Sequence, residues 1–276
     1  MNVFKQKCVE LRKAGYTLPE IVKVTGRPKT SVYSHIYNIP LSKERLRLIG
    51  LASGIRARNL ALARKGKSKR DFRKFAQWNK SNVALLAHLM FDGTINKTSC
   101  IYNNRNTSLI VMVENCMKEI YGHTPKRYLD EKTGVSRIAY HNVSLCIYLK
   151  IKSRELLKDI YLLSKSLKRE FIKAFFDDEG CIDFRPRRNL RQIRGYQKNI
   201  DILILMQVLL AEFGIQAKVI QPNEVVITRK ENLKKFQEEI NFSPGVRLNG
   251  ERSNSIWKKP LEKQFLLAQA IESFKN

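Results

Sequence analysis

Two apolar segments of the chain end in the same way, and this repetition constrains the fold more than any other feature. Residues 85–93 read LLAHLMFDG and residues 171–180 read FIKAFFDDEG. In both, apolar side chains recur at helical spacing, and an acidic residue is followed at once by glycine. Each segment is therefore expected to form a buried helix with a carboxylate at its C-terminal end. Carboxylates beside the unpaired carbonyls of such an end disfavour one another and attract a hard divalent cation.

Both segments resemble the signature helix of the LAGLIDADG homing endonucleases. The family's metal-binding acid directly precedes the final glycine, which corresponds to Asp92 in the first copy and Glu179 in the second. The family also has a small residue five positions before the acid, where the two helices cross closely, and Ala87 and Ala174 stand there. The 87 positions between the two acids fit one helix-strand-strand-helix-strand-strand-helix repeat.

The resemblance implies an α+β fold. It consists of two pseudo-symmetric αββαββα repeats forming a saddle of antiparallel sheets, preceded by a small all-α helix-turn-helix domain. The expected domains are residues 1–40 (helix-turn-helix), 41–80 (basic linker or helix), 81–150 (first repeat) and 151–276 (second repeat with a closing C-terminal helix). Because one chain supplies both halves, we expect a monomer.

The charge of the chain predicts a polyanionic partner. The 52 Lys and Arg residues exceed the 25 Asp and Glu residues, giving a formal net charge of +27. Counterion release makes nucleic acid the first choice for such a chain, and an anionic membrane surface is the competing one. No apolar run of about 18 residues or signal-peptide pattern is found in the sequence, so we expect an intracellular protein. Its five cysteines have no zinc-ligand spacing and are expected to be reduced.

Residues 3–39 show the pattern of a helix-turn-helix, with a turn at Gly26 before the third helix. Val32 and Ile36 lie four positions apart and should face the core of this module. Lys29, Thr30 and Tyr33 would then be exposed, a mixture of side chains suited to phosphates and base edges. A three-helix packing or dimerisation module is the alternative.

Residues 41–80 are strongly basic and contain only two acids, Glu44 and Asp71. We expect a helix over 43–64, a flexible join over 65–71, and phosphate contacts that include Arg64 and Lys65. A solvated linker is the alternative interpretation.

Both repeats contain candidate DNA-binding residues on predicted strands. In the first repeat, a strand is expected over 94–102, and outward-facing residues there and just after it are candidates: Asn96, Lys97, Tyr102, Asn103, Asn104 and Arg105. A solvated turn over 103–106 is equally compatible with the sequence. In the second repeat, a hairpin over 181–188 and 191–196 carries an arginine cluster suited to phosphate or guanine: Arg185, Arg187, Arg188, Arg191 and Arg194.

The resemblance implies an enzyme in which Asp92 and Glu179 are both catalytic and metal-binding. Mg²⁺ or another divalent cation held there would activate water against a phosphodiester, one acid for each DNA strand. A non-cleaving LAGLIDADG-derived DNA-binding transcriptional regulator is the alternative, favoured by Phe91 and by Met90 where the second copy has Asp177. An RNA-binding protein is a third possibility that shares the charge argument. The four histidines have no metal-ligand spacing.

Overall fold

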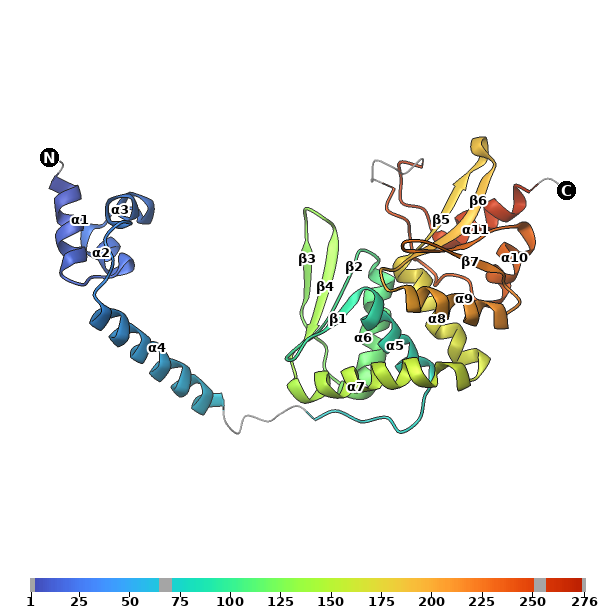
Figure 1. Cartoon of the computed structure of the whole chain (residues 1–276), viewed down its shortest axis with the longest axis horizontal. Helices are drawn as coiled ribbons and strands as arrows, with labels where there is room; N and C mark the ends of the chain where they lie inside the picture. Colours follow the sequence, from blue (N-terminus) through green and yellow to red (C-terminus); the bar gives the residue numbers. More distant parts are fainter. Residues whose placement is uncertain (1–2, 65–70, 251–256, 275–276) are drawn as a thin grey trace. The chain divides into compact units, whose positions relative to one another are not determined.

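The computed structural model describes residues 3–64, 71–250 and 257–274. The chain forms two compact units, residues 1–69 and residues 70–276, and each unit is described by itself. The second unit contains both acidic signature segments. It is a mixed α+β structure in which two four-stranded antiparallel sheets are covered by helices (Figure 1).

The first unit begins with three short helices. These are α1 (Val3–Lys13), α2 (Leu18–Thr25) and α3 (Lys29–Ile36). Their small core contains Cys8, Ile21, Val32 and Ile36, as the spacing in the third helix predicts. Gly26 ends α2 with a positive φ of 64°, a conformation that glycine adopts at little cost. Helix α4 (Lys43–Arg64) follows with the predicted bounds.

The first repeat has the order helix, two strands, helix, two strands, helix. Its elements are α5 (Lys80–Phe91), β1 (Gly93–Ile95), β2 (Cys100–Asn104), α6 (Thr107–Tyr121), β3 (Arg127–Asp130), β4 (Val135–Tyr140) and α7 (Val143–Asp159). The sheet order is β1-β2-β4-β3, and all neighbouring strands are antiparallel.

The second repeat has the same order and the same sheet topology. Its elements are α8 (Lys165–Glu179), β5 (Gly180–Arg185), β6 (Leu190–Tyr196), α9 (Ile200–Glu212), β7 (Ala217–Ile220), β8 (Glu224–Ile227) and α10 (Lys230–Glu239). The sheet order β5-β6-β8-β7 corresponds strand for strand to the first sheet. The prediction of two pseudo-symmetric αββαββα repeats is therefore confirmed.

One predicted element of the first repeat was wrong. Residues 94–102 form two antiparallel strands, β1 and β2, in place of one, because the chain reverses between Ile95 and Cys100. The sequence NKTS at this reversal is polar and short, as hairpin loops are. The closing helix α7 extends to Asp159.

Helices α5 and α8 lie against each other at the centre of the second unit. Ala87 and Ala174 are both buried in this core, so their small side chains permit close packing of the helices. At the helix ends the chain turns directly into a strand. A Cβ atom on Gly93 would lie 2.6 Å from the Leu89 Cα, and one on Gly180 would lie 2.4 Å from the Phe176 carbonyl oxygen. Glycine is required in the motif because the backbone passes too close for any side chain.

A C-terminal segment lies outside the two repeats. It crosses from α10 to helix α11 (Lys263–Glu272), which packs on the second repeat. Two backbone hydrogen bonds pair the ends of an arm, which we define as residues 246–250 and 257–263. The Leu248 N–H donates to the Leu261 carbonyl over 2.9 Å, and the Lys263 N–H donates to the Val246 carbonyl over 2.8 Å. The part of the chain between these two ranges lies outside the described residues.

Candidate active site

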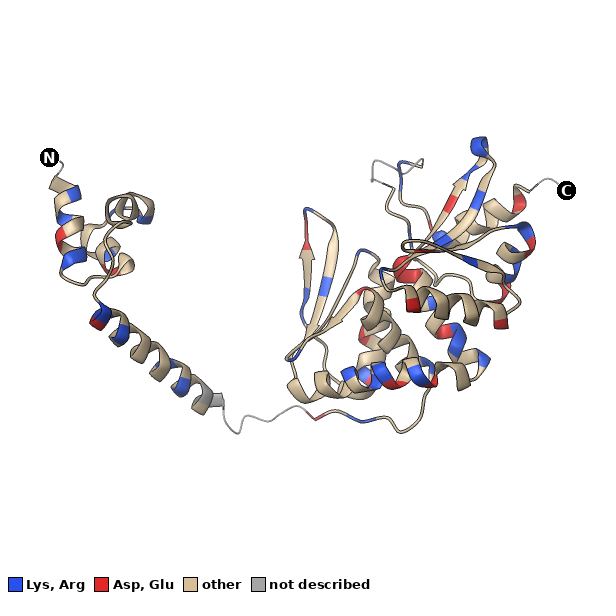
Figure 2. Ribbon diagram, viewed as in Figure 1, with Lys and Arg blue, Asp and Glu red and all other residues tan. Residues whose placement is uncertain are grey.

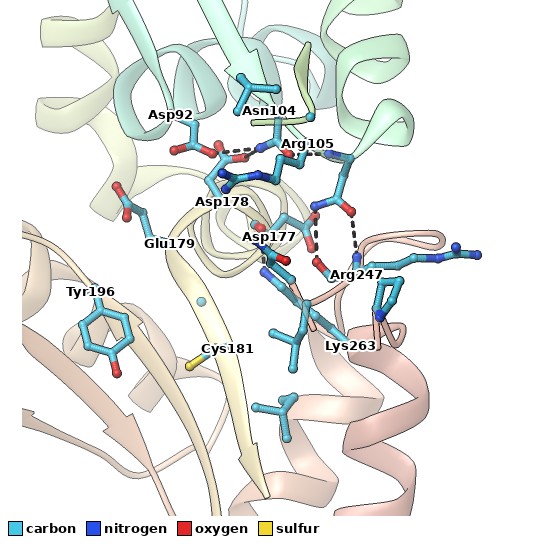
Figure 3. A pocket seen from close by; sticks show the side chains of 18 of the residues that line it. Asp92, Asn104, Arg105, Asp177, Asp178, Glu179, Cys181, Tyr196, Arg247 and Lys263 are labelled. Carbon is cyan, nitrogen blue, oxygen red and sulfur yellow. Dashed lines mark hydrogen bonds between the residues drawn. The ribbon is translucent and has the colours of Figure 1, made fainter. Parts of the chain in front are cut away.

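The C-terminal ends of α5 and α8 bring Asp92 and Glu179 to one cavity of about 1310 Å³. Figure 3 shows both carboxyl groups facing the same space. Acidic residues are concentrated where α8 runs into β5 (Figure 2). Residues of both sheets and of the C-terminal arm complete the wall of this cavity. The repeated acid-glycine motif therefore produces a single acidic centre.

Both carboxyl groups of this centre are hard to ionise. Burial raises the pKa of Asp92 to about 7, and the nearby Asp178 carboxylate contributes in the same direction. Burial also raises the pKa of Glu179 to about 7, with further increases from Asp92 and Asp178. Lys263 opposes both shifts without cancelling them. A group of partly buried carboxylates with these pKa values is stabilised by any cation that enters the cavity.

Asn104 orients the Asp92 carboxylate. Its Nδ2 donates a hydrogen bond to Asp92 Oδ2 over 2.8 Å, while its Oδ1 accepts from the Asn106 backbone N–H over 2.8 Å. Because the oxygen already accepts from the backbone, the amide nitrogen must point towards Asp92. Asn104 is itself buried, so this orientation is protected from competing water.

Asp178, the residue before Glu179, is held by a buried polar network. Its Oδ2 lies 2.8 Å from His88 Nδ1, and its Oδ1 accepts a hydrogen bond of 2.6 Å from the Tyr102 hydroxyl. Burial by itself would lower the pKa of His88, but the charge and hydrogen bond of Asp178, together with Asp177 and Asp92, raise it. His88 is therefore a counter-charge for the acids, contributed by the opposite signature helix.

Strand pairing identifies the equivalent positions in the two repeats. Gly93 pairs with Tyr102 in the first sheet, and Gly180 pairs with Gly195 in the second. The position of Tyr102 in the first repeat is therefore taken by Gly195 in the second. In the same alignment, counted back from the two glycines after the acids, His88 corresponds to Phe175 and Phe91 corresponds to Asp178.

The two halves of the helix pair have opposite chemistry at these equivalent positions. Asp178 contacts His88 in one half, whereas Phe91 contacts Phe175 edge-on at a ring distance of 5.2 Å in the other. A Cβ atom on Gly195 would lie 2.4 Å from the Phe175 ring, so the glycine makes room for that ring. One half is thus a polar network and the other an aromatic cluster.

Lys263 is a second buried cation at the centre. Its Nζ donates to the carbonyl oxygens of Phe176 over 3.0 Å and of Asp177 over 2.6 Å, at the C-terminal end of α8. These carbonyls would otherwise be unpaired at a helix end, and the charge interacts favourably with the helix dipole. Burial lowers the pKa of Lys263, while Asp177 and other neighbouring groups oppose this shift. The sequence provided no signal for this contact, because Lys263 lies 84 positions after Glu179.

Tyr102 and Asn104 do not face outward, contrary to expectation. Both are buried, at 1% and 7% exposure, on the face of β2 that packs on the helices. Tyr102 donates a hydrogen bond to Asp178 and Asn104 donates one to Asp92, so both contact the acidic centre and not solvent. The alternation from Cys100 through Tyr102 to Asn104 is the signal that could have placed them on the buried face.

Of the other DNA-binding candidates of the first repeat and first unit, Asn103 is half-buried, whereas Asn96 and the following five are exposed. In α3 these are Lys29, Thr30 and Tyr33, and in the first repeat they are Lys97 and Arg105, whose Nε donates to the Thr133 carbonyl over 2.8 Å. The Arg64 side chain and Lys65 lie outside the described residues, together with most of the expected join over 65–71.

The five arginines of the β5–β6 hairpin fall into two groups. Three are engaged within the protein: Arg185 with Asp183, Arg194 with Asp183 and Glu224, and Arg191 with Ser273 and the Phe274 ring. Arg187 and Arg188 are exposed at the tip and have no acidic partner among the described residues (Figure 2). The hairpin therefore offers two arginines whose charges are not already neutralised.

Within the described residues, no three His, Cys, Asp or Glu side chains are placed to hold a metal ion together. Asp92 and Glu179 alone would supply at most two protein carboxylates to an ion in the cavity.

None of the described helices combines the length and hydrophobicity required of a transmembrane span.

Comparison with known proteins identifies a domain in the second repeat. Residues 166–241, which span α8 to the end of α10, match the family model of the LAGLIDADG-like domain. No curated protein matches the chain.

Several solved structures resemble part of the chain. Variants of the homing endonuclease I-DmoI are 16% identical, with 60% of this chain and 96% of that chain covered and a TM-score of 0.45. I-DmoI in complex with DNA and Mn is also 16% identical, with 59% and 97% covered and a TM-score of 0.44. The N-terminal LAGLIDADG domain of WhiA is 14% identical, with 62% and 88% covered and a TM-score of 0.45.

Proposed function

We propose that this chain, which carries a LAGLIDADG-like domain at residues 166–241, is a sequence-specific DNA endonuclease that makes metal-dependent double-strand breaks. The observation that carries the proposal is the meeting of Asp92 and Glu179 in one cavity, each at the end of a signature helix. Both carboxyl groups have a pKa raised to about 7 by burial and by neighbouring acids. Two carboxylates held close together and partly buried destabilise the folded protein unless a bound cation neutralises them.

The chemistry of the donors fits a hard divalent cation such as Mg²⁺. Asp92 and Glu179 would hold the metal through carboxylate oxygens, which are the ligands that Mg²⁺ prefers. Because two carboxylates cannot complete the coordination shell, DNA phosphate and water must supply the remaining ligands. The bound metal would supply Lewis-acid stabilisation of the phosphate and a more acidic water.

The chain's own residues prepare this centre for a polyanion. Asn104 fixes the orientation of Asp92, and Lys263 and His88 place two buried positive charges near the acids. These charges limit the repulsion that four clustered acidic residues would exert on an approaching phosphate. One acid for each repeat also matches the two strands of a duplex, which a single chain can address as a monomer.

DNA is the substrate class that the charge of the chain supports. The net charge of +27 is far in excess of what solubility requires. Exposed basic residues occur on α3, at the β5–β6 tip and at Arg105, on surfaces able to contact phosphates. The mixed exposed surface of α3, with Lys29, Thr30 and Tyr33, supports a second DNA contact by the first unit.

A DNA-binding transcriptional regulator without cleavage activity is the second candidate. Met90 and Phe91 favour it, since they stand in the first repeat where the second repeat has the acids Asp177 and Asp178. The structure also shows Asp178 engaged by His88 and Tyr102, so this additional acid is not free to take part in hydrolysis.

Cleavage of a randomised duplex pool, with and without Mg²⁺, tests the proposal. The purified full-length chain should produce double-strand ends only with the metal, and sequencing of those ends would give the target. Asp92→Asn and Glu179→Gln should each abolish cleavage while duplex binding is retained. The control Asp201→Asn removes an exposed acid at the start of α9 and should cut like the wild type.

If the wild type and all three variants bind the duplex but produce no double-strand ends, the result would support the regulator instead. Undiminished cutting by both Asp92→Asn and Glu179→Gln would reject the assignment of the active site.

A further inference from the structure

The C-terminal arm lines the same cavity as the acidic pair, although it lies outside both repeats. Its residues Arg247, Leu248, Asn249, Trp257 and Pro260 form part of the wall. Parts of both sheets line the cavity as well, through the β3–β4 turn and through β5. The arm therefore borders the open space that a ligand of the acidic centre must enter (Figure 3).

The arm is anchored to both repeats. From the first repeat, the Asn106 side chain bonds to both backbone groups of Arg247: its Oδ1 accepts from the N–H over 2.8 Å and its Nδ2 donates to the carbonyl over 3.4 Å. From the second repeat, the Phe184 and Trp257 rings lie 5.8 Å apart, and Lys263 bonds to the end of α8. Anchors on both sides fix the arm over the centre, so its side chains are presented to a ligand without a large loss of entropy.

The exposed charges of the arm are mainly positive. The Arg247 side chain is 56% exposed and lies 3.7 Å from Glu262, a weak contact for an ion pair at the surface. Lys259 is exposed and has no acidic partner among the described residues. Arg247 lines the acidic cavity, and Lys259 lies in the chain between Trp257 and Pro260, which also line it. Positive charges on this segment are suited to an anion that must approach carboxylates.

We propose that the arm is a third DNA-contacting element, which binds the duplex directly across the acidic centre through Arg247 and Lys259. The two sheets would then bind the flanking half-sites, and the arm would bind the phosphates of the base pairs between them. This inference rests on the proposed function, because it requires that duplex DNA occupies the cavity. It adds a contact that neither repeat supplies.

The test uses full-length protein and the duplex that the wild type selects from a randomised pool. The double variant Arg247→Ala with Lys259→Ala is compared with a control, Lys158→Ala with Lys234→Ala. The control removes two exposed lysines from the outer helices α7 and α10, which do not line the cavity. Each lost phosphate contact reduces the magnitude of the slope of log K against log salt by about 0.9. The slope of the arm variant should therefore be smaller in magnitude by roughly 1.8 than that of the wild type. The control should keep the wild-type slope.

Hydroxyl-radical footprinting locates the lost contact. The arm variant should lose protection at the central base pairs only, with the flanks protected as in the wild type. Lys259→Ala alone, which breaks no ion pair of the described structure, should lower the slope by about 0.9 and covers the case in which the double variant is unstable.

A wild-type slope and footprint in the arm variants would overturn the inference while the proposed function stands. Failure of the wild type to select any duplex would overturn the proposed function, and the inference with it.

Discussion

His88 Nδ1 of α5 lies 2.8 Å from Asp178 Oδ2 of α8, and both side chains are shielded from solvent. The pair joins the two signature helices across their interface, one position before the acid of the second helix. At the equivalent place in the other half of the interface, Phe91 contacts Phe175. An ion pair and an aromatic pair therefore perform the same packing role on the two sides of one pseudo-twofold axis, which makes the two halves of the centre chemically unequal.

Removing one member of the ion pair should destabilise the protein strongly. Asp178→Leu leaves His88 buried near Tyr102 without its counter-charge, and we expect a loss of about 3 kcal/mol or more in the free energy of unfolding. The double variant His88→Leu with Asp178→Leu should recover part of this loss, because an apolar pair resembles the opposite half. Urea unfolding of the wild type, Asp178→Leu, His88→Leu and the double variant gives the coupling energy. Additive effects of the two substitutions would show that the pair is not coupled.

The acidic pair should make the protein less stable as the pH rises. A carboxyl group with a pKa of about 7 in the folded state holds its proton between pH 4 and pH 7, whereas the unfolded chain releases it. The folded state then binds more protons than the unfolded state, so stability falls across this range and the cost is fully present above pH 7.

Asp92→Asn removes one of these charges and should raise the melting temperature at pH 8 by about 2–4 °C, equivalent to about 1 kcal/mol, but not at pH 4. Mg²⁺ should raise the wild-type melting temperature more at pH 8 than at pH 5. Calorimetry at these pH values, with Asp201→Asn as the control, measures both effects. An equal gain for Asp92→Asn at pH 4 and pH 8 would contradict the assignment of its raised pKa.

Gly180 should be intolerant of any side chain. In Gly180→Ala the new Cβ would lie 2.4 Å from the Phe176 carbonyl oxygen and 2.8 Å from the Phe176 Cα, so the junction of α8 and β5 must shift. We expect a loss of about 1–3 kcal/mol, measured by thermal unfolding. Gly50→Ala in α4 is the control, since nothing lies within 4 Å of its Cβ. There the helix propensity of alanine should leave stability unchanged or slightly increased.

The tip of the β5–β6 hairpin should contribute to DNA affinity without contributing to stability. Arg187→Ala with Arg188→Ala removes two exposed charges that have no acidic partner among the described residues. We expect weaker duplex binding at low salt, a salt slope lower by up to about 1.8, and an unchanged melting temperature. Arg194→Ala is the contrasting variant. Because it breaks the contact with Glu224, it should lower the melting temperature as well.

The sequence alone determined the elements that depend on local pattern. The helical period of residues 85–91 and 171–179, and the acid and glycine that end each, were sufficient to identify α5, α8 and the repeat between them. The glycine is required because a side chain there would collide with the backbone four residues earlier. Its presence therefore follows from the local conformation of the motif. The bounds of α4 also follow from local sequence.

Only the tertiary structure decided which polar groups meet at the centre. Asp178 and Tyr102 are 76 positions apart, and Lys263 reaches a carbonyl 86 positions earlier. Periodicity can assign a residue to one face of a helix or strand. The side chains that the residue contacts depend on which other helix or strand packs against that face. The pseudo-twofold packing of α5 against α8, and the return of the C-terminal segment over them, decided those partners.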